Sequence, residues 1–105
     1  MSAATQTRHP ILKALDDLNN AVDCVDKHRE KIKSDGTISE PDLRDFKKSV
    51  RKAIRISNHM MALGFAEQNR LGIKAVEYAK QEQIYLRQIK NGLDQSKLVG
   101  ETDGQ

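Results

Sequence analysis

Apolar residues recur at alternating spacings of four and three through the first third of the chain, and this spacing is the strongest constraint on its fold. The pattern has the period of a heptad, which is typical of an α-helix that packs along one face against other helices. His9-Pro10 gives the helix a start, because proline is tolerated in a first helical turn. We therefore predict a helix over residues 10–33 along the seam Ile11, Leu15, Leu18, Val22, Val25, Arg29 and Ile32, in which only Arg29 is polar.

A second helix is predicted to begin at about Glu40. The polar segment Ser34-Asp35-Gly36-Thr37 ends the first helix, and Ser39 has the residue type of an N-cap. The neighbouring residues fit a capped start with a hydrophobic staple, and they are Ile38, Pro41, Asp42 and Leu43.

The end of this second helix is less well marked. Gly64 and Gly72 are the only breaks before Gly92, and no Ser, Thr or Asp follows either one to cap a third helix. We favour a break between Gly64 and Gly72 and a third helix to about Asn91, stopped by Gly92. A single bent helix from Glu40 to Asn91 is the alternative.

The composition agrees with a small all-α bundle of about three long helices. The chain has 105 residues, 37 % of them hydrophobic, with 6 Gly and 2 Pro, which is one domain's worth and disfavours a loop-rich β fold. We expect one helical domain over residues 9–92, a disordered tail over 1–8 and a flexible tail over 93–105. A single cysteine, no signal peptide and no long apolar run lead us to expect a cytoplasmic protein without a membrane segment.

Two segments imitate chemical sites but lack essential residues. Within residues 31–42, the segment Asp35-Gly36-Thr37-Ile38-Ser39 resembles the second half of a calcium-binding loop, yet Lys31 and Lys33 stand where the first oxygen ligands are needed. Cys24 and His28 are one helical turn apart, but the other half of a zinc site is missing. We therefore expect no metal, no cofactor and no enzymatic activity.

The second helix carries apolar residues on two opposite faces. At 100° per residue, one face forms a core stripe of Leu43, Phe46, Val50, Ile54, Met61 and Phe65. Ile56, Met60 and Leu63 lie opposite, and the third helix repeats this arrangement with Ile73, Val76 and Ile84. Because three helices bury one stripe each, we expect the second stripes to be covered by homodimerisation or by a protein partner. The alternative is a central helix that other helices of the chain bury on both sides. The predicted interface is Ile56, Met60, Leu63 and Phe65.

A basic face on the same helix supports an alternative function. Between Arg44 and Arg55 there are six basic residues and one acidic residue. Clustered cations suffice for contact with phosphate groups. The basic face itself has no aromatic residue to stack on bases, because Phe46 belongs to the core stripe. The alternative is a nucleic-acid-binding helical protein that uses Arg44, Lys48, Arg51, Lys52 and Arg55.

The general build points the same way as the apolar faces. In its length, lone helical domain, polar tails and two-faced segment over residues 54–65, the chain resembles the QslA-like family, small bacterial antiactivators of quorum sensing. The resemblance covers residues 10–92 and carries no diagnostic motif. It implies a regulatory protein that binds a LuxR-type transcription activator and blocks its dimerisation.

Overall fold

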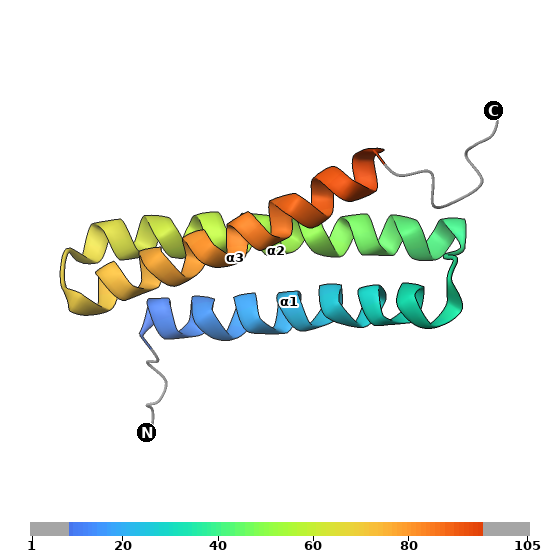
Figure 1. Cartoon of the computed structure of the whole chain (residues 1–105). Helices are drawn as coiled ribbons and strands as arrows, with labels where there is room; N and C mark the ends of the chain where they lie inside the picture. Colours follow the sequence, from blue (N-terminus) through green and yellow to red (C-terminus); the bar gives the residue numbers. More distant parts are fainter. Residues whose placement is uncertain (1–8, 96–105) are drawn as a thin grey trace, which may run out of the picture.

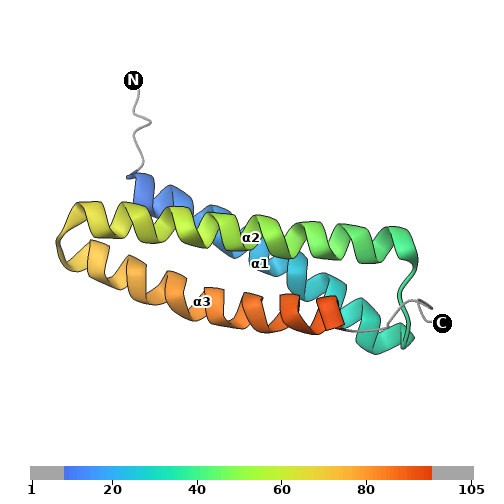
Figure 2. The same cartoon turned by 90° about the horizontal axis from the view of Figure 1, so that it is seen from above.

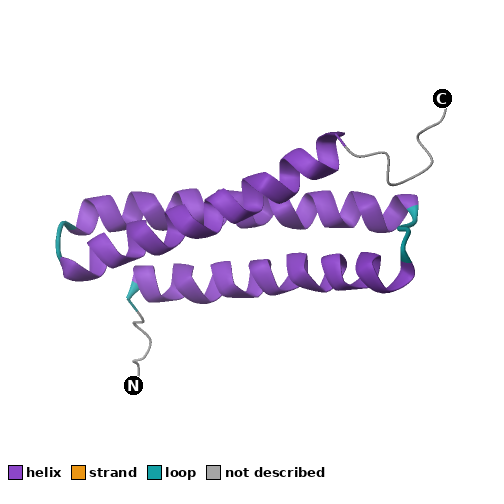
Figure 3. Cartoon of the chain, in the orientation of Figure 1, coloured by secondary structure: helices purple, strands orange, loops and turns teal. Residues whose placement is uncertain are grey.

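The computed structural model describes residues 9–95, and three long helices account for nearly all of them (Figure 1 and Figure 3). They are α1 (Pro10–Asp35), α2 (Glu40–Glu67) and α3 (Arg70–Gln95), and residues 9–95 contain no strand. The all-α class and the number of helices are thereby confirmed. The tails predicted for residues 1–8 and 96–105 lie outside the described residues.

The first turn follows its sequence signals closely. Gly36 ends α1 with φ 80°, a left-handed conformation that glycine adopts without strain, and its N–H donates to the Ile32 carbonyl at 2.7 Å. Ser39 then caps α2, because its hydroxyl accepts from the Asp42 N–H at 3.3 Å. Ile38 is buried beside the cap. The predicted stop, cap and helix start are all confirmed.

The second turn lies between the two glycines, but neither glycine forms it. Gln68 adopts the left-handed conformation with φ 54°, and Asn69 caps α3 by accepting from the Gly72 N–H at 2.9 Å. The sequence analysis considered only Ser, Thr and Asp as caps and so missed Asn69, although asparagine is an equally good N-cap. The break itself is confirmed, which excludes the single bent helix.

Gly64 and Gly72 instead allow α2 and α3 to approach closely. A Cβ atom placed on Gly64 would lie 2.6 Å from the Gly72 carbonyl oxygen and 2.7 Å from a methyl group of Val76. Both distances are shorter than side-chain packing permits. The two glycines are therefore needed inside their helices, where the backbones touch.

The bundle is built around α2. In Figure 2, α1 crosses behind α2, and α3 runs beside α2. Most contacts between helices involve α2, and few connect α1 with α3. The bundle measures 56 × 28 × 18 Å along its principal axes. Its core contains Ile11, Ala14, Leu18, Ala21, Val25, Phe46, Val50, Ala53, Ile54, Met60, Ala75, Ala79, Leu86 and Leu93.

The parallel helices α1 and α3 are joined mainly by tyrosine hydrogen bonds. Tyr78 donates its hydroxyl proton to Asn19 at 2.5 Å, and Tyr85 donates to Asp26 at 2.5 Å. Arg29, the polar residue of the heptad seam, donates to the Tyr85 hydroxyl at 2.7 Å. The interruption of the apolar seam thus has a structural use, since it holds α3 against α1.

The third helix does not stop at Gly92 as predicted, and it continues to Gln95. Leu93 is only 7 % exposed and belongs to the core. Burial of this side chain offsets the low helix propensity of glycine, which costs about 1 kcal/mol relative to alanine. Residues 93–95 therefore belong to the helix, not to a flexible tail.

Candidate protein-binding surface

The predicted interface on α2 is wrong at Met60, which the structure places in the core. Met60 is 2 % exposed, and Ile56 and Leu63 are half-buried against the same core. The physical reason is the central position of α2, because Met60 lies among residues of both α1 and α3. Cover by other helices of the chain, the alternative to an interface, is therefore what the structure shows for this residue.

Phe65 is the member of the predicted interface that faces solvent. It is 62 % exposed, so its other assignment, to the core stripe of α2, is wrong. Phe65 follows Gly64, the point at which α2 touches α3, and one further residue turns the side chain by about 100° away from that contact.

Exposed apolar side chains gather at one end of the bundle, which we call the apolar end. Within residues 9–95, five large apolar side chains are exposed, and Ile84 at the middle of α3 is one of them. The other four lie in the first turn of α1, the last turn of α2 and the first turn of α3, which meet at this end (Figure 1). They are Leu12, Phe65, Leu71 and Ile73, with exposures of 37 %, 62 %, 36 % and 60 %.

The three helix ends are held together here by His9 and Glu67. The Nδ1 atom of His9 accepts from the Ile11 N–H at 3.1 Å and so caps α1, while its Nε2 atom lies 3.2 Å from the Glu67 carboxylate at the end of α2. Glu67 also accepts from the Asn69 side chain at 3.3 Å. The apolar end is therefore a fixed arrangement of three termini rather than three frayed ones.

One face of the apolar end is hollowed between α1 and α3. This apolar groove has a volume of about 320 Å³, and Met60 of α2 is among its lining residues. Leu12 and Leu71 are exposed members of the lining, from α1 and α3 respectively. The remaining lining residues are Ile11, Leu15, Asn19, Lys74, Ala75 and Tyr78.

The basic face of α2 is where the helical arithmetic predicts it. All five side chains are exposed, and within residues 9–95 none of them makes an ion pair. An unpaired surface cation retains its full capacity to meet an anionic partner. This basic face consists of Arg44, Lys48, Arg51, Lys52 and Arg55.

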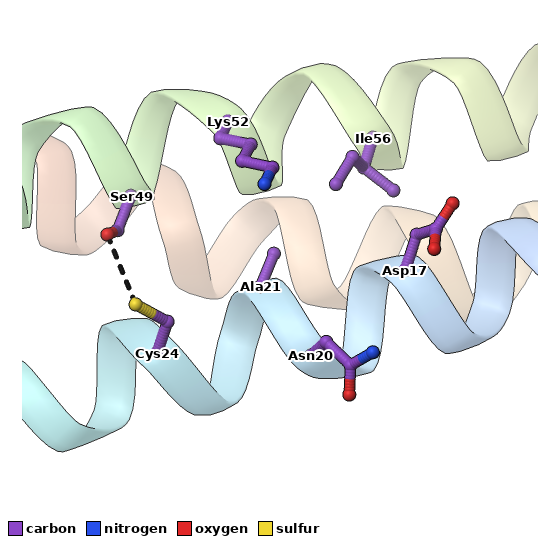
Figure 4. Close-up of a pocket in the computed structure, with 7 residues that line it drawn as sticks. All are labelled: Asp17, Asn20, Ala21, Cys24, Ser49, Lys52 and Ile56. Atoms are coloured by element: carbon purple, nitrogen blue, oxygen red, sulfur yellow. Dashed lines mark hydrogen bonds between the residues drawn. The ribbon is translucent and has the colours of Figure 1, made fainter.

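The lone cysteine lies in a polar groove between α1 and α2 (Figure 4). The Cys24 sulfur is 3.4 Å from the Ser49 hydroxyl, while His28 stacks on Phe46 with ring centroids 5.4 Å apart. A serine hydroxyl is not a base that would activate a thiol. The groove is lined by Asp17, Asn20, Ala21, Cys24, Ser49, Lys52 and Ile56.

Residues 9–95 contain no cluster of three or more His, Cys, Asp or Glu side chains placed to hold a metal. None of the three described helices is long and apolar enough to span a bilayer. No known protein family, curated protein or solved structure was found to match this chain.

Proposed function

We propose that this chain is a small non-enzymatic regulatory protein that binds a protein partner through its apolar end. The observation that carries the proposal is the gathering of Leu12, Phe65, Leu71 and Ile73 where three helix ends meet. Burying a large apolar side chain is worth about 1.5–3 kcal/mol, less the costs of association. A rigid end that exposes four of them is better suited to a partner than to water.

The apolar end replaces the surface first expected on α2. The residues of the predicted interface other than Phe65 are buried or half-buried against the core, and they are Ile56, Met60 and Leu63. Homodimerisation stays a prediction. The second apolar stripe of α2 does not support it, because that stripe packs against the core of its own chain. Ile73 and Ile84 on α3 remain as exposed apolar residues that a second copy could bury.

The resemblance to quorum-sensing antiactivators adds one specific candidate partner. A LuxR-type transcription activator would be blocked if this chain occupied its dimerisation surface. A two-hybrid assay of the chain against the LuxR-type activators of its native host tests this candidate directly. The broader proposal of partner binding at the apolar end does not depend on it.

The broader proposal is tested by capture from a native-host lysate with three variants. Leu71→Glu places a charge in the apolar groove, and Ile73→Glu places one at an exposed position of the apolar end that does not line the groove. Ile84→Glu is a matched control because Ile84 is 61 % exposed and lies outside that end. We expect at least one apolar-end variant to lose about tenfold of the captured partner, or 1.4 kcal/mol, while Ile84→Glu retains it. Equal capture by all three variants, or equal loss in all three, would contradict the proposal.

A second candidate function is nucleic-acid binding through the basic face. The specific observation in its favour is that five exposed cations lie unpaired on one side of α2. This function predicts that Arg51→Ala with Arg55→Ala weakens binding to duplex DNA, and that the affinity falls steeply with salt. Binding that is insensitive to both changes would rule it out.

A further inference from the structure

The two tyrosine bridges between α1 and α3 share one register. Asn19 pairs with Tyr78, and seven residues later Asp26 pairs with Tyr85, so both bridges join residues 59 positions apart. One heptad towards the apolar end, the same offset places Leu12 opposite Leu71. The polar bridges are therefore absent at this level, and two exposed leucines stand in their place.

The apolar groove opens where these bridges end. Its lining is mostly aliphatic, and its two exposed leucines belong to different helices. Two of its polar groups, the Tyr78 hydroxyl and the Asn19 side chain, already bond to each other. Leu12 to Asn19 is one heptad, about 10 Å or two helical turns, which matches the reach of two or three apolar side chains on a docked helix.

The charges beside the groove indicate what kind of helix fits it. Arg70 and Lys74 occupy the first turns of α3, which has no acidic residue in its first turn, and within residues 9–95 neither makes an ion pair. The N-terminus of a helix also carries a partial positive charge. Lys74 itself lines the groove. Two cations that form no ion pair within residues 9–95 therefore lie beside an apolar trough.

We propose that the apolar groove between α1 and α3 receives an acidic amphipathic helix from a partner protein. Apolar residues of that helix at spacings of three and four would enter between Leu12 and Leu71, and its carboxylates would meet Lys74 and Arg70. A second copy fits less well, because α3 exposes Ile84 between Lys80 and Arg87, whose charges repel those beside the groove. This inference rests on the proposed protein-binding function and locates the partner more closely.

The first test uses a synthetic probe with the full chain. The probe is a fluorescein-labelled helical peptide of about 15 residues with leucines at spacings of four and three and glutamates at its other exposed positions. The control peptide has lysine in place of every glutamate. We expect fluorescence anisotropy to show binding of the acidic peptide, with the lysine peptide weaker by about tenfold or more. No binding of the acidic peptide, or equal binding of both peptides, would overturn the proposal.

Charge reversal within α3 provides the matched variants. Lys74→Glu reverses a charge in the groove lining, and Lys80→Glu makes the same change at an exposed position outside it. We expect the first to weaken the acidic peptide by about tenfold and the second to change its affinity less than about twofold. Equal effects of the two reversals would mean that general charge, not the groove, attracts the peptide.

The same variants separate failure of this inference from failure of the proposed function. Ile73→Glu could abolish capture of the native partner while Leu71→Glu and Lys74→Glu leave it intact. The partner would then bind the apolar end outside the groove, and the groove assignment would be wrong. Sedimentation of the wild-type chain tests whether a second copy of this chain occupies the groove. A dimer that Leu71→Glu converts to monomer would place a second copy in the groove and overturn the proposal.

Discussion

In both turns of this bundle, the residue that follows the preceding helix has the left-handed backbone conformation, but the residue type differs between the two turns. Gly36 has φ 80° after α1, and Gln68 has φ 54° after α2. A glycine in that position signals the stop in the sequence, whereas a glutamine does not. The second turn is instead held by tertiary contacts, since Gly64 and Gly72 meet beside it and Glu67 reaches His9.

The surfaces at the two turns differ in the same way. The first turn is polar apart from buried Ile38, and Lys31 and Asp42 form an ion pair across it at 3.0 Å. The second turn is flanked by exposed Phe65, Leu71 and Ile73. A turn that is set locally needs nothing beyond its own residues, while the turn that depends on distant contacts also presents the surface suited to a partner.

The largest expected effect comes from a methyl group at the glycine contact. Gly64→Ala improves helix propensity by about 1 kcal/mol, but its Cβ would collide with the Gly72 carbonyl oxygen and with Val76. We expect a net loss of about 1–3 kcal/mol in the free energy of unfolding, measured by urea denaturation.

Gly92→Ala is the control for that change, because Gly92 is also helical and nothing lies within 4 Å of its added Cβ. It should stabilise the chain by up to about 1 kcal/mol. A gain of stability in both variants would mean that α2 and α3 are not in contact at Gly64.

Removal of the two caps tests whether the turns are equally dependent on them. Ser39→Ala and Asn69→Ala each remove one side-chain acceptor from a helix start, at 3.3 Å and 2.9 Å from its N–H donor. We expect each to cost about 1 kcal/mol in thermal or urea unfolding. Ser34→Ala, at an exposed position near the end of α1, is the control. An Asn69→Ala variant as stable as the control would mean that the Asn69 side chain does not stabilise the start of α3.

Exchange of the left-handed residues sharpens the comparison between the turns. Gln68→Gly should stabilise the chain by up to about 1 kcal/mol, because glycine relieves the side-chain clash at positive φ. Gly36→Ala should destabilise it by a similar amount for the same reason. Differential scanning calorimetry of both variants measures the two signs. Equal signs would contradict the left-handed assignment of one of the two residues.

The smallest effect concerns pH at the first turn. Hydrogen bonds from Lys31 and from Ser39 lower the pKa of the Asp42 carboxyl below its ordinary 3.8. A carboxyl with a lowered pKa in the folded state contributes stability above about pH 3.8, and this contribution is lost as the pH falls through the folded-state pKa. Wild type should therefore lose slightly more stability than Asp42→Asn between pH 6 and about pH 2.5, as urea midpoints would record. An identical loss would mean that the ion pair is without effect.

Much of this fold could be predicted because its signals are local. The seam of α1, the Gly36 stop and the Ser39 cap each depend on residues within a few positions of one another, and all three are confirmed. The placement of α2 between its neighbours is not local, so the sequence analysis assigned Met60 to the surface. The same limit explains Gly92, where burial of Leu93 carries the helix onward.

The candidate site was predictable only in part. Phe65 was named as an interface residue from its position in the two-faced segment, and the five basic residues were placed correctly on one exposed face. The groove between Leu12 and Leu71 depends on the register of α1 and α3, which are separated by α2 in the sequence but meet in space. That register becomes visible only once Tyr78 and Tyr85 are seen to bridge to α1.

The tyrosine bridges have a consequence for the order in which the chain folds and opens. Contacts of α2 with α1 and with α3 both close short turns, but α2 shares more of them with α3. Each tyrosine bridge between α1 and α3 must close a loop of 59 residues and bears a larger entropic cost. We therefore expect the α2–α3 hairpin to form first and α1 to dock on it last. Amide hydrogens of α1 should then exchange with solvent ahead of those at the α2–α3 contact.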